Sequence, residues 1–465
     1  MIKTPLAPAI PPALLRTVDG PGPRYTSYPT ADRFVETFGP DDYLRAVCAR
    51  RDGPARAAPI SVYVHVPFCA SLCYYCACNK VVTRHHEQAT PYLDALEREI
   101  ALQAAALGAR PAVSQLHLGG GTPTFLSDDE LERLMRMLGD AFEIGAGAEV
   151  SIEVDPRTVD GERLARLRAL GFNRLSFGVQ DFDPEVQRAV HRIQPEEQVR
   201  ALLETARALG FESTNVDLIY GLPKQTPASF ARTLEQVRAL RPDRIALYAY
   251  AHLPQRFKPQ RRIESADLPS GEGRLAMLAA AIAGFADEGY EYVGMDHFAL
   301  PDDALAIAKR EGRLHRNFQG YSTQPDCDLV ALGVSAIGKV GATYSQNAKT
   351  LPEYYAALQA GRLPVVRGLA LSADDELRRA AIMAIMCQGR LDFARLSAAH
   401  GVDPRVIFTD ELAALAPLEA NGLVVRNADA VQVTPLGWYF VRSIAMVFDR
   451  YVRSDANRDR YSRIV

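Results

Sequence analysis

The sequence Ser61-Val-Tyr-Val-His-Val66, followed at once by Pro67-Phe-Cys69-Ala-Ser-Leu-Cys73-Tyr-Tyr-Cys76-Ala-Cys78, decides the fold. Valine and tyrosine favour extended backbone, so the first six residues predict a strand. Four cysteines then fall within ten residues, in the segment that leaves this strand. A strand that ends in a loop of ligand-type side chains is typical of an α/β enzyme, whose site lies at the carboxyl ends of parallel strands.

Apolar β-forming runs alternate with amphipathic stretches as far as residue 288, and each pair predicts one strand–helix unit. The six units are Ser61–Val66 with Tyr92–Ala106, Gln115–Leu118 with Asp128–Phe142, Glu149–Val154 with Gly161–Leu170, Arg174–Val179 with Pro195–Leu209, Ser213–Ile219 with Pro227–Leu240, and Arg244–Ala251 with Gly271–Glu288. Successive units of this kind require parallel strands joined by crossover helices. An open doubly wound sheet and a barrel both satisfy this requirement.

The placement of unusual residues favours the barrel. The turn Gly119–Gly121 follows the second strand, Glu153 ends the third, and Gln180 follows the fourth. Side chains gathered after successive strands are typical of a barrel with its site on the C-terminal face. Because six units cannot complete an eightfold barrel, we expect an α/β fold built on a partial (β/α)6 TIM-like barrel that is open on one side.

The segments that flank these units lack this alternation. Residues 1–55 carry several prolines and are expected to form an N-terminal arm or lid. Residues 56–365 would form the catalytic barrel with its closing loops, which include the Gly-rich and polar stretch Arg313–Ser345. Residues 366–465 predict a mostly helical, winged-helix-like C-terminal domain. Its expected elements are helices at Asp374–Met386, Phe393–His400 and Thr409–Ala416, a hairpin of Leu423–Val425 and Val431–Val433, and a last helix at Gly437–Tyr451.

Length and composition exclude several classes of protein. A chain of 465 residues with 48% hydrophobic and 23% charged residues is typical of a soluble enzyme with more than one domain. The formal net charge of −3 argues against a surface for nucleic acid, and no apolar run is long enough to span a membrane. The N-terminal stretch is too rich in proline for a signal peptide, so a cytoplasmic location is expected.

The cysteines indicate a metal or redox centre rather than disulfides, because their total of seven is odd and no export signal precedes them. The spacing Cys69-x₃-Cys73-x₂-Cys76 lets one loop wrap three corners of a cuboidal iron–sulfur cluster. The fourth iron would then be open to the amino and carboxylate groups of a small molecule. A structural zinc site is one different interpretation, but zinc modules usually need a second cysteine pair at a distance. A four-cysteine cluster that also uses Cys78 is another, and its two-residue separation from Cys76 would strain it.

The cysteine loop, placed after the first strand of a βα series, resembles the radical S-adenosylmethionine (SAM) superfamily, whose fold is a partial or full (β/α) barrel. The extra Cys78 and four further motifs narrow the resemblance to the oxygen-independent coproporphyrinogen III oxidases of haem synthesis. These motifs are Arg24-Tyr-Thr-Ser-Tyr-Pro-Thr30, Gly119-Gly-Gly-Thr-Pro-Thr124, Met295-Asp-His-Phe-Ala299 and Asn317-Phe-Gln-Gly-Tyr-Ser-Thr323. The resemblance runs from the N-terminal arm to the C-terminal domain.

The resemblance implies the function and its cofactors. The expected reaction is the anaerobic oxidative decarboxylation of two propionate side chains of coproporphyrinogen III to vinyl groups through a 5′-deoxyadenosyl radical. It gives protoporphyrinogen IX and uses a [4Fe–4S] cluster and two SAM molecules. A flavodoxin- or ferredoxin-like protein would donate single electrons, and the chain would act as a monomer without nucleic acid or membrane partners.

The resemblance also assigns residues to the site. Cys69, Cys73 and Cys76 would hold the cluster. The first SAM would contact Tyr63, Gly120, Glu153 and Ile337, and the second Tyr75, Gly121, Thr122, Gln180, Arg192, Asp217 and Ala251. Tyr63 and Cys78 are the catalytic candidates, and Arg24 or Arg33 are candidates for the substrate carboxylates.

Each of these residues also has a plainer interpretation. Gly119–Gly121 could be only a tight turn, Glu153 a solvated strand end, and Arg192 a surface ion pair, whereas Cys78 could be a thiol that merely packs. At the level of the whole chain, haem-binding chaperones share the cluster motif but usually carry Phe at the position of Cys78 and lack the Arg24–Thr30 arm. A ring-opening methyltransferase acting on haem, and a zinc protein that binds nucleic acid through a winged helix, are two further hypotheses.

Overall fold

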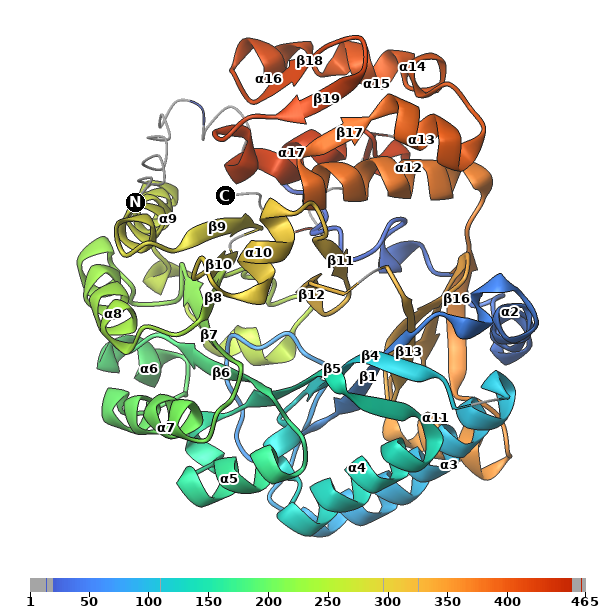
Figure 1. Ribbon diagram of the computed structural model, residues 1–465. Helices are drawn as coiled ribbons and strands as arrows, with labels where there is room; N and C mark the ends of the chain where they lie inside the picture. The colour runs from blue at the N-terminus through green and yellow to red at the C-terminus, as the bar shows by residue number, and fades with distance from the viewer. Residues whose placement is uncertain are drawn as a thin grey trace.

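The structure is a computed structural model that describes Leu14 and residues 20–108, 110–295, 297–324, 326–453 and 461. In this part of the chain a twelve-stranded sheet forms the centre of the molecule (Figure 1). Its order is β16 (Val365–Ala370), β15 (Thr343–Asn347), β14 (Ile337–Val340), β13 (Asp328–Leu332), β1 (Ile60–Val66), β4 (Ala112–Gly120), β5 (Glu143–Val154), β6 (Arg174–Gln180), β7 (Ser213–Tyr220), β8 (Arg244–Ala249), β10 (His297–Ala299) and β9 (Glu291–Gly294). The strands from β13 to β8 are parallel, and those at either end are antiparallel.

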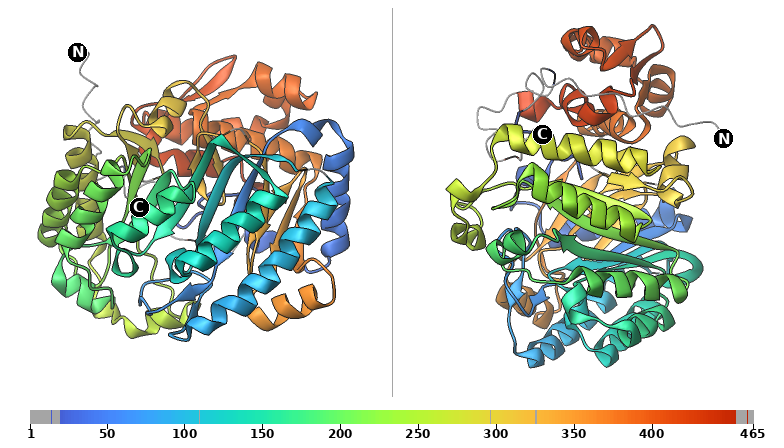
Figure 2. Two further views of the ribbon diagram at one scale, coloured as in Figure 1. Left: turned by 60° about the horizontal axis from the view of Figure 1, so that its bottom comes forward. Right: turned by 90° about the vertical axis from the view of Figure 1, so that its left-hand side faces the viewer.

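Helices connect the parallel strands and cover the outer face of the sheet (Figures 1 and 2). They are α3 (Ala89–Leu107), α4 (Asp128–Ala141), α5 (Gly161–Ala169), α6 (Pro184–Ala189), α7 (Glu196–Ala208), α8 (Pro227–Leu240) and α9 (Gly271–Asp287), with α10 (Ala304–Arg310) and α11 (Leu351–Gln359) later in the chain. Ser127 shows why such a helix begins where it does. Its hydroxyl accepts the Glu130 N–H, and the Glu130 carboxylate accepts the Ser127 N–H at 2.8 Å, so two otherwise unpaired donors of the first turn are satisfied. No helix of the described residues is long and apolar enough to cross a bilayer.

The predicted α/β class and the six strand–helix units are confirmed. Each predicted strand corresponds to one of β1, β4, β5, β6, β7 and β8, and α8 matches its predicted limits, Pro227–Leu240, to the residue. The described sheet ends in two different edge strands, β16 and β9, rather than closing into a ring. The prediction missed the short helix α6, which lies between β6 and α7.

The prediction that Arg313–Ser345 forms only loops is wrong. This stretch contains the hairpin β11 (His315–Asn317) and β12 (Gly320–Ser322), then β13 and β14, and most of β15. Strands of three to five residues with interspersed polar positions show too little periodicity to be recognised. β13 exists because β1 pairs with it in parallel, which is a tertiary condition that the segment does not show by itself.

The N-terminal arm contains a helix that was not predicted, α2 (Pro40–Asp52). Only Tyr43, Val47 and Arg50 are buried in it, so its apolar stripe is too narrow to read from the sequence. Tertiary contacts hold it instead: the Tyr43 hydroxyl donates to the Gln103 side chain of α3 at 3.0 Å, and Arg50 pairs with Asp328 at 2.9 Å.

The arm between residues 20 and 38 lies between the sheet and the C-terminal region. The Tyr25 hydroxyl donates to Asp449 at 2.9 Å, the Arg442 guanidinium donates to the Pro23 carbonyl at 2.8 Å, and Val35 forms a β-bridge with Gly368. The arm is therefore tied to both parts of the molecule. Most of its predicted first part, residues 1–13 and 15–19, lies outside the described residues.

The C-terminal region is mostly helical, as predicted. It consists of α12 (Ala373–Met383) with a π-helical turn (Ala384–Gln388), β17 (Arg390–Asp392), α13 (Phe393–His400), α14 (Pro404–Ile407), α15 (Thr409–Ala414), α16 (Ala416–Ala420), β18 (Val424–Arg426), β19 (Ala430–Val433), a 3-10 turn (Gly437–Phe440), α17 (Val441–Met446) and α18 (Arg450–Arg453). The predicted hairpin is present, and β17 joins it to make the order β17-β19-β18. The likeness to a winged helix stays a prediction.

The single last helix predicted at Gly437–Tyr451 is wrong, because this segment is divided into three short pieces. The Asp449 carboxylate accepts the N–H groups of Tyr451 at 2.8 Å and Val452 at 3.0 Å, which starts a new helix at that point. An aspartate that bonds to the backbone just ahead of it competes with continuation of the previous helix.

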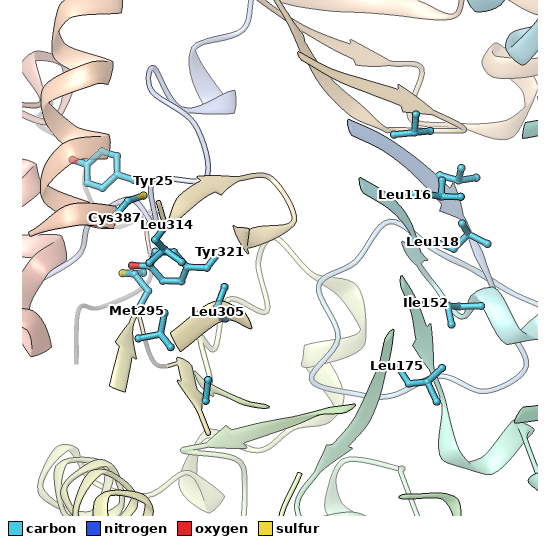
Figure 3. Close-up of a cluster of buried hydrophobic side chains, with 14 of the residues drawn as sticks. Tyr25, Leu116, Leu118, Ile152, Leu175, Met295, Leu305, Leu314, Tyr321 and Cys387 are labelled. Atoms are coloured by element: carbon cyan, nitrogen blue, oxygen red, sulfur yellow. The ribbon is translucent and has the colours of Figure 1, made fainter. Parts of the chain in front are cut away.

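The apolar core extends without a break from the sheet to the C-terminal region. Figure 3 shows its two ends: Leu116, Leu118, Ile152 and Leu175 lie in a row along β4, β5 and β6, whereas Leu314, Tyr321, Met295 and Cys387 gather where the β11–β12 hairpin meets the π-helical turn. Packing of this kind joins the two regions into one continuous core.

A buried carboxylate, Glu99 of α3, fastens this helix to the strands that were not predicted. It is 0% exposed and accepts the Gly333 N–H at 2.7 Å, the Asn347 amide at 2.6 Å and the Tyr354 hydroxyl at 2.6 Å. Burial raises the pKa of Glu99 to about 7, although the three hydrogen bonds oppose the shift.

This raised pKa predicts a pH dependence of stability. The unfolded chain releases the Glu99 proton near pH 4.5, and the folded chain releases it only near pH 7. The stabilisation is therefore fully present below pH 4.5 and is lost as the pH rises through 7. Between those values we expect the free energy of unfolding of the wild type to fall by about 3 kcal/mol relative to that of Glu99→Gln, measured by urea unfolding.

The matched control is Glu97→Gln, on the same helix, because the Glu97 side chain is 56% exposed. Its free energy of unfolding should depend on pH as that of the wild type does. If Glu99→Gln also showed the wild-type pH dependence, the prediction would be wrong, and Glu99 would titrate normally in the folded chain.

Candidate active site

A cavity of about 430 Å³ lies at the carboxyl ends of the parallel strands, where the cysteine loop leaves β1. Twelve of the predicted site residues line it: Cys69, Cys73, Tyr75, Cys76, Cys78, Gly120, Gly121, Thr122, Glu153, Gln180, Arg192 and Asp217. They come from the ends of five strands and from the loops that follow them. The prediction that these residues share one site is consistent with this arrangement.

Backbone hydrogen bonds hold the cysteine loop against the rest of the barrel. The Thr83 N–H donates to the Cys69 carbonyl at 2.9 Å, and the Tyr74 N–H donates to the Val190 carbonyl at 3.0 Å. Both Cys69 and Cys73 are 8% exposed, whereas Cys76 is half-buried. The thiols are thus presented from a loop with fixed ends.

Two arginines approach the Cys73 sulfur. The Arg192 Nη1 lies 3.5 Å and the Arg157 Nη2 3.7 Å from its Sγ, and both cations share the Asp155 carboxylate, at 3.2 and 2.7 Å respectively. Arg192 is 6% exposed, and its pKa is raised despite burial because of the surrounding anionic partners. The Cys73 sulfur therefore lies beside two cations that share one carboxylate.

A second electrostatic feature lies at Cys76. A hydrogen bond between the Cys78 and Cys76 side chains and the ammonium of Lys80 together lower the pKa of Cys76 to about 6, although burial opposes them. The same sharing raises the pKa of Cys78. Lys80 also donates to the carbonyls of Cys76 at 3.1 Å and Cys78 at 3.4 Å, so it fixes the backbone of the loop as well.

The glycines after β4 permit close contact between this strand end and the cysteine loop. Gly120 has a φ of 118°, which disfavours any side chain, and a Cβ there would lie 2.8 Å from the His65 ring. A Cβ on Gly121 would lie 2.5 Å from the Pro67 carbonyl oxygen. The interpretation of this segment as only a tight turn is therefore insufficient, because neither position has room for a side chain.

Glu153 is held toward the cavity from the neighbouring strand. Its carboxylate accepts the Gly120 N–H at 3.1 Å and lies 3.5 Å from the His117 ring nitrogen. The His117 ring stacks on Tyr63 at 6.0 Å between centroids, and the Tyr63 hydroxyl lies 3.1 Å from His65 Nδ1. Burial, together with the nearby Glu153 charge, raises the pKa of Tyr63.

Asp217 of β7 provides a second carboxylate. It accepts the Asn215 amide at 2.8 Å and the Ser176 hydroxyl at 3.2 Å. Burial raises the pKa of Asp217 to about 7, and the Glu153 charge adds to the shift. The neighbouring Gln180 has a φ of 73°, an uncommon backbone conformation that occurs where the chain leaves β6.

Three predicted contacts do not line the cavity. Tyr63 lies behind His117 and Glu153, as described above. Ala251 is tied to the cysteine loop through Gln260, whose amide donates to the Ala251 carbonyl at 3.1 Å and to the Tyr75 carbonyl at 2.9 Å. Ile337 begins β14, which is antiparallel to β13, so it lies at the same edge of the sheet.

Residues to which the sequence analysis assigned no role also line the cavity, among them Lys80, Asp155, Arg157, Ser176 and Tyr248. Asp155 and Arg157 follow β5, and they contact Arg192 and the Cys73 sulfur respectively. Their position directly after a strand is typical of site residues in this kind of fold. Other charged residues also follow strands, so only the tertiary contacts around Cys73 identify these two.

The donor set fits a [4Fe–4S] cluster. Three thiols line one cavity, cations lie next to two of them, and the glycine turn packs directly against their loop. Among the described residues no three His, Cys, Asp or Glu side chains converge closely enough to hold a single metal ion. Thiolates that ligate separate irons of a cluster have no need to converge in that way.

Sequence comparison supports this interpretation. The profile of the radical SAM superfamily matches residues 63–237, and that of the HemN C-terminal domain matches residues 371–440. The chain is 51% identical to the oxygen-independent coproporphyrinogen III oxidase of Escherichia coli over 97% of its own length and 98% of that protein. It is 50% identical to the protein of the same name from Pseudomonas aeruginosa over 97% of its own length and 98% of that protein.

The chain belongs to the oxygen-independent coproporphyrinogen III oxidase family. The solved structure of the Escherichia coli coproporphyrinogen III oxidase (HemN), described as a radical SAM enzyme, superimposes with a TM-score of 0.88 at 51% identity, covering 92% of this chain and 97% of that one. Membership of the radical SAM superfamily implies a [4Fe–4S] cluster and SAM as cofactors. The hypotheses of a zinc site and of a winged-helix protein that binds nucleic acid are thereby set aside.

Iron analysis tests the cluster ligands. We expect about four irons per chain after anaerobic reconstitution of the wild type, and loss of most of this iron in Cys69→Ser, Cys73→Ser and Cys76→Ser. Cys78→Ser is the matched variant in the same loop and should retain the cluster. Measurement is by iron and sulfide assay with the absorption spectrum. Equal iron loss in all four variants would favour a four-cysteine cluster.

Proposed function

We propose that the chain carries out the anaerobic oxidative decarboxylation of coproporphyrinogen III. Two propionate side chains become vinyl groups, which yields protoporphyrinogen IX in haem synthesis. The single observation that supports this most is the set of three thiols in one cavity of a chain that is 51% identical, nearly end to end, to an enzyme of this name.

The chemistry that the bound cluster and SAM supply is one-electron formation of a 5′-deoxyadenosyl radical, which removes a hydrogen atom from the β-carbon of a propionate. Loss of CO₂ and transfer of one further electron to a separate one-electron acceptor would then leave the vinyl group. The residues of this chain bind and orient the reactants. In the proposal Cys69, Cys73 and Cys76 hold the cluster, and Arg157 and Arg192 stabilise the Cys73 thiolate from 3.7 and 3.5 Å.

The first SAM would lie beside the glycine turn and Glu153. The Glu153 carboxylate accepts the Gly120 N–H, and its charge suits an ammonium group. Tyr63 would help to orient Glu153, because its ring stacks on His117, which in turn contacts the Glu153 carboxylate. Ile337 would contact the adenine. Excluding water from the part of the cavity beside Glu153 would protect a reactive radical.

The second SAM would occupy the other half of the same cavity. Tyr75, Gly121, Thr122, Gln180, Arg192 and Asp217 all line the cavity, and Gln260 joins the Ala251 carbonyl to that of Tyr75. Asp217 lines the cavity together with Ser176, and its carboxylate could accept from a ribose hydroxyl or a protonated amine. Two SAM molecules would match two decarboxylations.

Cys78 is proposed to handle a proton or a hydrogen atom near the second SAM. Its thiol shares a hydrogen bond with Cys76 and lines the cavity, which supports a position beside the proposed cluster. Tyr63 is the other proposed catalytic residue.

The electrons are proposed to come from a flavodoxin- or ferredoxin-like protein, because the reaction needs them singly. His191 and Ile193 lie on the surface on either side of Arg192, which contacts Cys73, and Ile193 is 63% exposed. A donor that docks there would lie close to Cys73, one of the proposed cluster ligands. We further propose that the chain acts in the cytoplasm as a monomer, without nucleic acid or a membrane.

An anaerobic assay tests the reaction. With dithionite, SAM and coproporphyrinogen III, the wild type should form the divinyl product and 5′-deoxyadenosine, read by chromatography after oxidation of the porphyrinogens. Cys73→Ser should lower the rate by at least about a thousandfold, because removing a residue that acts as part of a unit abolishes most catalysis. A reconstituted wild type that binds the tetrapyrrole but forms no divinyl product would contradict the proposal.

Equilibrium dialysis tests the number of SAM molecules. The reconstituted wild type should bind two per chain and Asp217→Ala only one, because this variant removes a proposed contact of the second molecule. Glu212→Ala, an exposed carboxylate next to the start of the same strand, is the matched control and should bind two. A stoichiometry of one in the wild type would contradict the second site.

A further inference from the structure

A second cavity, of about 660 Å³, lies where the β11–β12 hairpin meets the C-terminal region. Its walls come from the end of α10, from β11, from α12 and its π-helical turn, and from β17 and α13. It shares no lining residue with the cysteine cavity. Nothing in the reaction described above uses it, although its volume is ample for a small-molecule ligand.

A buried arginine without a carboxylate lies in the wall of this cavity. Arg316 is 4% exposed, donates from Nε to the Arg24 carbonyl at 3.2 Å, and stacks its guanidinium 4.7 Å from the Tyr321 ring. Its Nη1 has no hydrogen-bond partner, and no ion pair of Arg316 occurs within the described residues. Burial and the neighbouring Arg24 lower the pKa of Arg316. A buried cation of this kind is costly unless an anion joins it.

The other charged groups of the cavity are largely matched with one another. Arg379 forms two hydrogen bonds with Asp326, at 2.7 and 2.8 Å, and Arg390 pairs with Asp392 at 3.3 Å. Glu311 pairs with Arg313, which lies outside the cavity. The imidazoles His315 and His400 complete the set, and burial lowers the pKa of His315.

Arg395 on the exposed side of α13 is a second cation of this cavity for which the described residues provide no carboxylate partner. The cavity therefore has two positive charges, those of Arg316 and Arg395, that no carboxylate of the described residues pairs with. Arg316 is buried and Arg395 is exposed. The remaining walls are apolar and include Leu314, Met383, Ala384, Cys387 and Leu396. Figure 3 shows Leu314, Tyr321 and Cys387 gathered at this junction.

One unpaired acceptor adds a further condition on the ligand. The Gln388 amide nitrogen donates to the Leu314 carbonyl at 2.7 Å, so its oxygen faces elsewhere, and this buried Oε1 has no donor among the described residues. An N–H group on the ligand would satisfy it. A molecule with apolar surface, carboxylates and N–H groups meets all three requirements, whereas a fatty acid lacks the N–H.

We propose that this cavity is a second tetrapyrrole site, in which a carboxylate binds Arg316 and Arg395 and a pyrrole N–H donates to Gln388. The choice of tetrapyrrole rests on the proposed function, since such carboxylates are what that reaction consumes and releases. The site is distinct from the place of reaction, because a row of three aromatic rings separates Arg316 from the cysteine cavity. Arg316 stacks on Tyr321, the Tyr321 ring contacts His297 at 5.7 Å between centroids, and His297 contacts Tyr248, which lines the cysteine cavity, at 5.9 Å.

Calorimetric titration tests this site, with coproporphyrin III as the probe and the anaerobically reconstituted protein with SAM as the receptor. Arg316→Met removes the buried charge and keeps the aliphatic stem, and Arg395→Glu reverses the charge at the rim. We expect one class of porphyrin sites to weaken at least tenfold in the first variant and several-fold in the second. Arg136→Glu, on the exposed face of α4, is the control for net charge and should leave binding unchanged.

Decanoate, which has a carboxylate but no N–H, is the comparison ligand and should bind at least tenfold more weakly than the porphyrin. Equal porphyrin binding in the wild type, Arg316→Met and Arg395→Glu would overturn the proposal, as would decanoate binding as tightly as the porphyrin. Arg395 is exposed, so its variant keeps the test valid if Arg316→Met fails to fold. Turnover of coproporphyrinogen III by the wild type is measured in parallel. Turnover with unchanged porphyrin binding in the variants would contradict only this second site, whereas absence of turnover would contradict the proposed function.

Discussion

The parallel pairing of β1 with β4 is the constraint on which the site depends. Its register sets Val66 opposite Gly120, and the Gly121 N–H donates to the Val66 carbonyl at 2.8 Å. The cysteine loop and the glycine turn therefore leave the sheet side by side. Parallel β5 then adds Glu153 and Asp155 to the same edge. A shift of one residue would turn these side chains to the other face of the sheet and separate the thiols from their cationic partners.

Charge compensation distinguishes the two cavities. In the first, two arginines share one aspartate and contact a thiol, so each cation has an anionic partner. In the second, Arg316 is as deeply buried as Arg192 but has no carboxylate in the described chain. The two arginines thus differ in their partners. Arg192 completes an internal network, whereas Arg316 has no carboxylate partner among the described residues.

The N-terminal arm connects these parts physically. Tyr25 bonds to Asp449 in the C-terminal region, and the carbonyl of Arg24 accepts from Arg316 beside the second cavity. The Arg24 guanidinium lies 5.2 Å from the Tyr248 ring, which lines the first cavity. The candidate role of Arg24 toward substrate carboxylates remains a prediction, but its position places it between the two cavities.

The sequence by itself determined the six strand–helix units and the cluster loop. Local patterns suffice there, because buried parallel strands are continuous apolar runs and the three cysteines lie within eight residues of one another. It also indicated Gly120 and Glu153, which lie at strand ends, whereas Arg192, between α6 and α7, came only from the family resemblance. In contrast, β13 and α2 escaped recognition because partners far along the chain, β1 and α3, hold them in place. Only the tertiary structure could show that Arg157 meets Cys73 and that Arg316 is buried without a carboxylate partner among the described residues, because both facts depend on which residues distant in sequence become neighbours in space.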